Sequence, residues 1–375
     1  DRSVSRGLGD VYKRQYLDHA ATTPVPKAVA DAMYTVLTEQ YANPNAQYPF
    51  GQEMRRSVED WRAVIAKAVG CEANQLFFTS CGTEGDNWAI RAACWQNRHV
   101  GRHIVTTAVE HHAVLNCCQQ LEQEGWEVTT ILPDQNGDIS AESVLAAVRP
   151  DTALVSVMMV NNELGSIYPI ADIAKGLKAV NEETLLHTDA VQGFLKVPFS
   201  AKALGADFIA ISGHKIGAPK GIGALFVRDS QRQTLKPPYL GGHQERGLRP
   251  GTENTPYIVG LGLAAAKGAK NLSDRNAHIR ALNAQLRTGL EELAQQAPIT
   301  LNSPADAVPE VLNFSTNCVN SQTFIEYLSG RYIYISGGSA CDKGEPSHTL
   351  MAMGTPDLAC LLYTSPSPRD TERSR

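Results

Sequence analysis

Short apolar runs alternate along the chain with segments whose apolar residues recur every three or four positions. The runs predict strands at residues 76–78, 104–106, 128–131, 154–160, 185–187, 208–211 and 224–227. The periodic segments predict helices at residues 52–69, 87–95, 114–124, 141–148 and 170–180. Because strands alternate with helices, we expect an α/β fold in which a mostly parallel sheet is covered by helices on both faces.

From about residue 259 the pattern becomes mainly helical, through 279–294. A shorter stretch follows, with a strand predicted at 311–315 and a helix at 322–329. We therefore expect a large domain over residues 16–258, whose first helix packs with the small domain. The small α/β domain is expected over residues 259–359.

The two ends of the chain lack the periodicity of the body. Residues 1–15 are polar, and residues 361–375 combine Ser-Pro repeats with charged residues. Such compositions are typical of disorder. We assign residues 1–15 and 360–375 to flanks outside the fold. Both strings resemble non-native translated ends, and ordinary frayed termini are the alternative.

Composition narrows the class of protein. The 375 residues are 43% hydrophobic and 19% charged, with a net charge of -5, which is ordinary for a soluble protein. No basic stripe indicates direct nucleic-acid binding, and no apolar run is long enough to span a membrane. The eight cysteines show no zinc-binding or C-x-x-C spacing, so we expect free thiols and a cytoplasmic location.

The segment Ser212-Gly213-His214-Lys215 follows an apolar run that predicts a strand, and a glycine-rich stretch comes after it. We expect a loop that presents Lys215 at the end of this strand. A lysine held in this way can form a Schiff base, because its amine is fixed and its pKa can be lowered. Most lysines are solvated surface charges, so the assignment of Lys215 depends on the loops upstream.

Polar residues also follow other predicted strands, and ligands bind at the carboxyl ends of strands in such sheets. Gly82-Thr83 opens a helix whose free N–H groups would attract a phosphate, although a simple capped helix has the same pattern. Asp189 would keep a cofactor ring nitrogen protonated, or would cap the next helix. Gln192 would donate to a ring oxygen. His111 would stack on the ring, unless it has a structural role or binds a metal with His112.

These loops together match the parts of a pyridoxal phosphate molecule, and longer strings agree with that interpretation. Over nearly all of residues 16–359 the chain resembles a cysteine desulfurase of the iron–sulfur-assembly branch, in the class V aminotransferase family. The matching strings are Tyr16-Leu17-Asp18-His19-Ala20-Ala21-Thr22-Thr23-Pro24, Gly82-Thr83-Glu84, Glu110-His111, Asn161-Asn162-Glu163-Leu164-Gly165, Asp189 to Gln192, Ser212 to Lys215, Arg249-Pro250-Gly251-Thr252 and Ser336-Gly337-Gly338-Ser339-Ala340-Cys341. The resemblance implies the aminotransferase type I fold, pyridoxal 5′-phosphate as cofactor, L-cysteine as substrate and a homodimer. It also implies a sulfur-accepting partner, either an iron–sulfur scaffold or a tRNA-thiolation protein.

Carried over residue by residue, the resemblance assigns the contacts of the cofactor. Lys215 would bind it covalently and take the α-proton of the substrate, Asp189 would pair with the ring nitrogen, and Gln192 would face the ring oxygen. His111 would stack on the ring and move protons. The remaining roles concern the phosphate and the substrate: Gly82, Thr83, Ser212 and His214 would hold the phosphate, Asn162 would lie beside cofactor and substrate, and Thr252 would reach the phosphate of the neighbouring subunit.

Cys341 carries the chemistry that is specific to cysteine desulfurases. Its glycine-rich surroundings, residues 337–344, predict an exposed loop in which a thiol can become a nucleophilic thiolate. The resemblance implies that Cys341 attacks the substrate sulfur, keeps it as a persulfide and releases L-alanine. The only metal contact that it implies is a transient one between Cys341 and an iron–sulfur cluster. The extra Gly338 and a loop that looks shorter than in familiar relatives leave the sulfur acceptor open.

The end of the chain departs from the family pattern. Relatives continue past Met353-Gly354 into a strand with an arginine that binds the substrate carboxylate, whereas this chain runs into the Ser-Pro tail. We do not assign that role to Arg369, and we expect a C-terminally truncated chain. The alternatives to an active cysteine desulfurase are a related enzyme such as a selenocysteine lyase or an aminotransferase, an inactive cofactor-binding fragment, or a scaffold for iron–sulfur assembly.

Overall fold

The computed structural model describes residues 14–316, 319–337, 347–355 and 362–364. The predicted nucleophile Cys341 lies outside these described residues. Within them, no helix combines the length and the apolar character that crossing a membrane requires.

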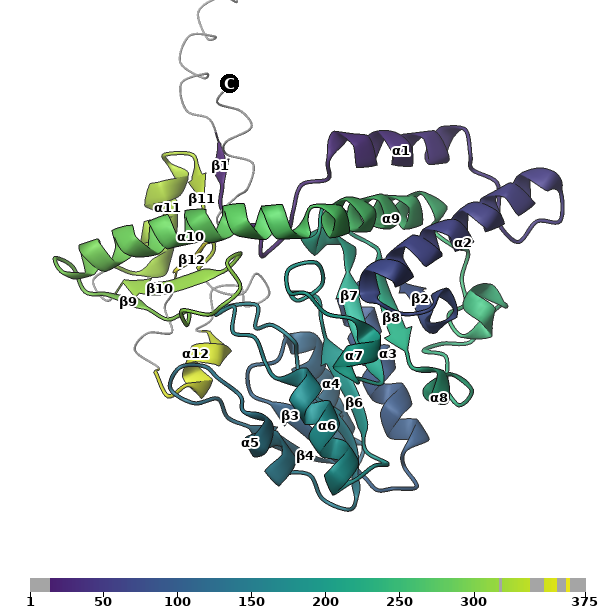
Figure 1. The fold of residues 1–375 in the computed structure, drawn as a ribbon, viewed down its shortest axis with the longest axis horizontal. Coiled ribbons are helices and arrows are strands. Elements are labelled where there is room, and N and C mark those ends of the chain that lie inside the picture. The colour runs from purple at the N-terminus through teal and green to yellow at the C-terminus, as the bar shows by residue number, and fades with distance from the viewer. Residues whose placement is uncertain (1–13, 317–318, 338–346, 356–361, 365–375) are drawn as a thin grey trace, which may run out of the picture.

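A seven-stranded sheet forms the centre of the larger part of the molecule (Figure 1). Its strands are β2 (Leu76–Thr79), β3 (His103–Thr107), β4 (Glu127–Ile131), β5 (Thr152–Ser156), β6 (Leu185–Asp189), β7 (Phe208–Ser212) and β8 (Gly223–Val227). In space they follow the order β2-β8-β7-β6-β5-β3-β4. Strand β8 pairs antiparallel with β2 and β7, and the other pairs are parallel. The prediction of an α/β fold with a mostly parallel sheet is therefore confirmed.

Apart from the edge strand β4, the strands of this sheet are buried on both faces, and successive side chains along a strand point to opposite faces. Phe77 belongs to the core that the sheet forms with α3 (Gly82–Gln96) and α4 (His112–Gln123). Phe78 belongs to the core on the other face, under α5 (Ala141–Ala146), α6 (Ile170–Val180) and α7 (Ala201–Leu204). Strands buried on both faces need continuous apolar runs, which is why the sequence pattern located them.

A second group of helices packs beside the sheet. Helices α1 (Lys27–Thr38) and α2 (Pro49–Val69) both pack against α9 (Thr255–Lys270). The long helix α10 (Leu272–Ala294) then runs from α9 to the smaller part of the molecule (Figure 1). The short helix α8 (Asp229–Arg232) follows β8.

The smaller part contains an antiparallel sheet in the order β12-β10-β9, with β9 at Ile299–Leu301, β10 at Leu312–Thr316 and β12 at Leu362–Thr364. It also contains α11 (Ser321–Ser329), α12 (His348–Ala352) and a parallel pair of β1 (Gln15–Tyr16) with β11 (Ile333–Tyr334). Gln15 and residues 362–364 belong to strands, although their composition places them in the flanks. Strands of two or three residues are too short to show an alternation of apolar and polar residues. Backbone hydrogen bonds to a partner strand determine their position, and the sequence pattern does not show these bonds.

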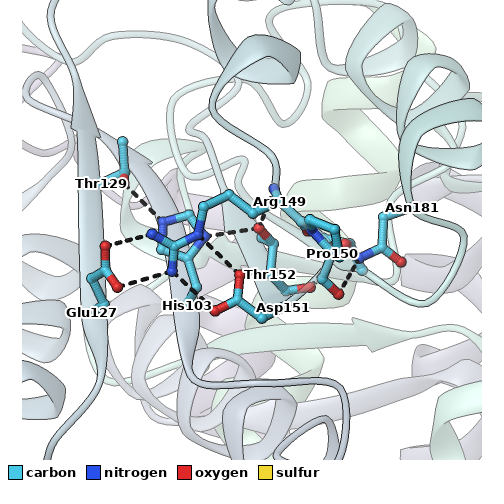
Figure 2. Close-up of polar contacts among 9 residues, drawn as sticks. His103, Glu127, Thr129, Arg149, Pro150, Asp151, Thr152 and Asn181 are labelled. Atoms are coloured by element: carbon cyan, nitrogen blue, oxygen red, sulfur yellow. Dashed lines mark hydrogen bonds and ion pairs between the residues drawn. The ribbon is translucent and has the colours of Figure 1, made fainter.

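A network of hydrogen-bonded and ion-paired side chains connects the amino ends of β3, β4 and β5 (Figure 2). Arg149 forms ion pairs with Glu127 and Asp151, at 2.5 and 2.9 Å. The backbone N–H of Arg149 donates to the Thr152 hydroxyl, which also lies 2.8 Å from Nδ1 of His103. Because these residues lie at the amino ends of the strands, the network stabilises the edge of the sheet opposite to the one where ligands bind.

Candidate functional site

A cavity of about 280 Å³ lies at the carboxyl ends of β5, β6 and β7. Its walls include all the predicted cofactor-binding residues except Thr252, namely Gly82, Thr83, His111, Asn162, Asp189, Gln192, Ser212, His214 and Lys215. Thr252 is exposed in the segment before α9 and does not line this cavity. The residues converge because parallel strands end at the same edge of the sheet.

Lys215 is the last residue of a single 3-10 turn, Gly213–Lys215, that follows β7 directly. The sequence predicts a loop here, and one 3-10 turn is a tight connection of the kind that often follows a regular element. The Nζ atom of Lys215 donates to the carbonyl oxygens of Ala20 and Ala21, at 2.5 and 3.0 Å. The N-terminal segment therefore fixes the amine of Lys215 at the wall of the cavity.

Asp189 is the last residue of β6 and is only 5% exposed. Burial raises the pKa of its carboxyl, and the nearby His111, the N–H of Val191 and Lys215 act in the opposite direction. Oδ1 of Asp189 accepts from the Val191 N–H at 2.8 Å. A protonated nitrogen placed beside this carboxylate would lower its pKa further and offset the cost of burying the charge.

His111 is the N-cap residue of α4, and its Nδ1 accepts from the backbone N–H of Ala113 at 3.0 Å. An imidazole whose Nδ1 accepts carries its proton on Nε2 when it is neutral. Burial lowers the pKa of His111, with Asp189 opposing this shift. Neutral His111 can therefore present an Nε2–H donor while its ring forms part of the wall.

The N-terminus of α3 forms another wall of the cavity, together with Ser212. The N-cap residue Cys81 makes no side-chain hydrogen bond to the first turn, so the backbone N–H groups of that turn can bind an anion. The carboxylate of Glu84 lies in the same turn but is paired with Arg249 at 2.8 Å. Its negative charge is therefore compensated and does not oppose an anion at the helix end.

Two neighbouring residues also fit a phosphate at this wall. A Cβ atom on Gly82 would lie 2.6 Å from Cγ2 of Val191, so the lack of a side chain lets the backbone of α3 pack closely. Nδ1 of His214 lies 3.2 Å from the hydroxyl of Thr22. Burial lowers the pKa of His214 to about 4, so near neutral pH it contributes as a polar group and not as a cation.

Gln192 is buried in the turn after β6, and both ends of its carboxamide have partners. Nε2 donates to the carbonyl oxygen of Ala20 at 3.0 Å, and Oε1 accepts from Nζ of Lys196. The side chain also lines the cavity, as the predicted contact with a ring oxygen requires. Asn162 lies in the segment after β5 and lines the same cavity.

Asp86 is a titratable lining residue that the sequence interpretation did not find. It is 1% exposed, and its Oδ1 lies 3.4 Å from Nε2 of His187. Burial and the charges of Asp189 and Glu110 raise the pKa of Asp86 well above its usual value, while burial lowers that of His187 to about 3. Burial therefore disfavours the charged form of both groups. The signal in the sequence was a carboxylate four residues before Ile90, on the buried face of α3.

Comparisons with known proteins agree with this geometry. Residues 15–363 match the family model described as Aminotransferase class-V. The chain is 40% identical over 347 residues to cysteine desulfurase IscS of Methanosarcina thermophila, a match that covers 92% of this chain and 84% of the relative. A solved NifS-like protein superposes with a TM-score of 0.88 at 35% identity and covers 94% of both chains. The structure of SspA in complex with cysteine gives a TM-score of 0.80 at 34% identity, over 94% of this chain and 99% of that one.

The chain therefore belongs to the aminotransferase class-V family, where its relatives are cysteine desulfurases. The cofactor of this family is pyridoxal 5′-phosphate, and the cavity fits that molecule in three respects. It offers the amine of Lys215 for the aldehyde, the buried carboxyl of Asp189 for the ring nitrogen, and the open N-terminus of α3 for the phosphate.

Proposed function

We propose that the protein is a cysteine desulfurase that converts L-cysteine to L-alanine and keeps the sulfur as a persulfide on Cys341. The observation that carries the proposal is the single cavity that Lys215, Asp189 and His111 share with the N-terminus of α3. The names of the relatives, and the cysteine bound in the SspA structure, support the choice of substrate.

When bound, pyridoxal phosphate withdraws electrons from the α-carbon of the amino acid joined to it. Lys215 holds the cofactor, and its Nζ, once released, takes the proton from the substrate α-carbon. The Asp189 carboxylate keeps the ring nitrogen protonated, which strengthens the withdrawal of electrons. His111 would stack on the ring and move protons.

The thiolate of Cys341 then attacks the sulfur of the substrate. A sulfur–sulfur bond forms and the carbon–sulfur bond breaks, and the electron pair that is left on the β-carbon takes up a proton. Return of the α-proton from Lys215 then gives alanine. Asn162 lies beside the substrate in this arrangement. The persulfide sulfur passes from Cys341 to a protein acceptor, either an iron–sulfur scaffold or a tRNA-thiolation protein.

The working form in this proposal is a homodimer in which Thr252 contacts the phosphate in the neighbouring subunit. Thr252 is exposed and lies outside the cavity of its own chain. Large apolar side chains are exposed on α1 and in the segment leading to α2, namely Tyr34, Leu37, Tyr41 and Tyr48, and a subunit interface would bury them.

The cysteines that the structure describes are free, which supports a reducing compartment such as the cytoplasm.

The test is cysteine-dependent formation of alanine by the cofactor-loaded protein, with mass spectrometry of Cys341 to detect the persulfide. Cys341→Ser should keep the yellow cofactor and lose both products, because cofactor binding and sulfur transfer use separate groups. Cys71→Ser is the matched control, since Cys71 lies outside the cavity, and it should keep both products. A Cys341→Ser variant that forms alanine at the parental rate would refute the proposal. A parent protein that acts on selenocysteine and not on cysteine would indicate a selenocysteine lyase.

A further inference from the structure

Lys196 is a buried cation beside the cavity that the proposed mechanism does not use. It is 7% exposed and lies four residues after Gln192, in the turns that follow β6. Its Nζ donates to Oε1 of Gln192. Lysine is almost never fully buried unless it is paired. We therefore look for the role of Lys196 in its contact with Gln192.

This contact determines which way the carboxamide of Gln192 faces. The Gln192 atom beside Lys196 is the oxygen Oε1, and the charged form of Lys196 can only donate to it. On the other side, Nε2 of Gln192 donates to the carbonyl oxygen of Ala20 at 3.0 Å. A reversed carboxamide would place a donor against the ammonium and an acceptor against the carbonyl. Lys196 and Ala20 therefore specify the same orientation.

The carbonyl of Ala20 connects this arrangement to Lys215. It accepts from Nε2 of Gln192 and also from Nζ of Lys215, at 2.5 Å. A carboxamide nitrogen carries two hydrogens, and Ala20 takes one of them. Because Gln192 lines the cavity, the second N–H can meet a ring oxygen of the cofactor. In the reversed orientation the same place would hold an oxygen, which repels another oxygen.

Helix α10 holds the backbone of Lys196 from behind. Nδ2 of Asn276 donates to the carbonyl oxygen of Lys196 at 2.7 Å. Arg275, the preceding residue of α10, donates to the carbonyl oxygen of Leu195. The turn that carries the side chain of Lys196 is therefore fixed by two neighbouring residues of one helix.

Other charges face the amine of Lys196. Glu310 raises the pKa of Lys196, whereas Lys215 and Arg275 lower it, and burial is the largest effect and lowers it to about 7. Arg275 pairs with Glu310 at 3.9 Å. In either protonation state the amine of Lys196 keeps N–H groups that can donate to Gln192.

We propose that Lys196 is a positioning residue that fixes the carboxamide of Gln192 so that an N–H faces the ring oxygen of the cofactor. The proposal rests on pyridoxal phosphate binding in this cavity, as the proposed function does, but not on the identity of the substrate. Lys196 does not line the cavity and acts through Gln192. A hydrogen bond donated to the ring oxygen stabilises the negative charge of that oxygen. The oxygen then attracts the proton on the nitrogen that joins Lys215 to the cofactor less strongly, and the pKa of this nitrogen falls. The pH midpoint of the cofactor's absorbance change therefore depends on Lys196.

The experiment is a pH titration of the absorbance of the cofactor-loaded protein. Lys196→Met should raise the midpoint by about half a pH unit to one unit, the size expected for loss of one hydrogen bond to the cofactor. Gln192→Leu should shift it in the same direction. In the Gln192→Leu background, Lys196→Met should add no further shift, since the two residues act as one unit. Lys202→Met, an exposed lysine on α7, is the control and should leave the midpoint unchanged.

A merely structural role for Lys196 gives different results. Lys196→Met would then lower the unfolding temperature of the cofactor-free protein and leave the midpoint unchanged, or would add an independent shift to Gln192→Leu, and either outcome overturns the proposal. If Lys196→Met does not fold because the buried Glu310 loses one of the cations that face it, the double variant Lys196→Met with Glu310→Gln removes both charges and takes its place in the titration. A parent protein that binds no cofactor would overturn the proposed function and this inference together. A loaded parent with an unshifted variant overturns the inference alone.

Discussion

The hydroxyl of Ser347 donates a hydrogen bond of 2.5 Å to Oε2 of Glu163, and both side chains are buried. Oε1 of the same carboxylate accepts from the hydroxyl of Thr349 at 3.2 Å. Ser347 comes six residues after Cys341, and Glu163 directly follows Asn162 of the cavity wall. Glu163 therefore ties the chain downstream of the proposed nucleophile to the segment beside the site.

Glu163→Gln should slow persulfide formation on Cys341 by about tenfold or more, because hydrogen bonds to a charged group are worth about 1.5–3 kcal/mol each. The absorbance of the bound cofactor should not change, since Glu163 does not line the cavity. Exposed Glu182→Gln is the matched control. Single-turnover persulfide formation and cofactor spectra together check this prediction. A parallel loss of cofactor binding would instead give Glu163 a role in the whole site.

Gly82→Ala should weaken cofactor binding. Its Cβ would lie 2.6 Å from Cγ2 of Val191, so α3 or Val191 must shift and the phosphate-binding N–H groups shift with them. Val191→Ala removes the opposing methyl groups and should restore much of the affinity in the double variant. The measurement is the Kd for pyridoxal phosphate in the single and double variants. Equal affinity for parent and Gly82→Ala would contradict a phosphate site at the N-terminus of α3.

Glu110 should make the protein less stable as the pH rises. Burial raises the pKa of Glu110 from 4.5 to about 8, so the folded state favours the protonated carboxyl. The resulting stabilisation is full below the unfolded pKa, near 4.5, and is lost as the pH rises through the folded pKa, near 8. The contribution of this one proton to the slope cannot exceed about 1.4 kcal/mol per pH unit.

Glu110→Gln should flatten this pH dependence. A glutamine oxygen can still accept from the hydroxyl of Thr107 and the N–H of Met158, which lie 2.9 and 2.8 Å from Oε1. The free energy of unfolding in urea, measured at several pH values for both proteins, tests the prediction. Identical slopes in parent and variant would show that Glu110 does not titrate in this window.

Arg149→Met should lower the stability of the protein without affecting the site. The ion pairs of Arg149 with Glu127 and Asp151 lie at the amino ends of the strands (Figure 2) and are partly exposed, so the expected fall in Tm is small. The Kd for the cofactor and its absorbance should stay at the parental values. A changed cofactor spectrum would contradict the separation of this network from the cavity.

Six strands of the large sheet were predictable because each is buried on both faces and therefore needs an apolar run, whereas the edge strand β4 is only partly buried. Helix α1 was not, since it buries only Val29 and Val36 and shows too narrow an apolar face. The pairing of β1 with β11 joins segments far apart in the chain and leaves no local pattern.

The same distinction holds for the site. Lys215 and Asp189 come a few residues after apolar runs, so the rule that ligands bind at strand ends found them. Their specific roles came from resemblance, because spacing alone left caps and surface charges as alternatives. Asp86 and Lys196 were missed, because their contacts with His187 and Gln192 form only in the folded chain. All four side chains are buried there, and no local sequence pattern indicates these contacts.

Covalent labelling tests the central claim that Lys215 holds pyridoxal phosphate. The protein is loaded with the cofactor, reduced with borohydride and digested, and the modified peptide is identified by mass spectrometry. We predict the label on Lys215 and its disappearance in Lys215→Ala, because the amine of Lys215 is fixed at the cavity wall by Ala20 and Ala21. A label on Lys196 or Lys220 in its place, or a loaded protein that takes no label, would contradict the claim.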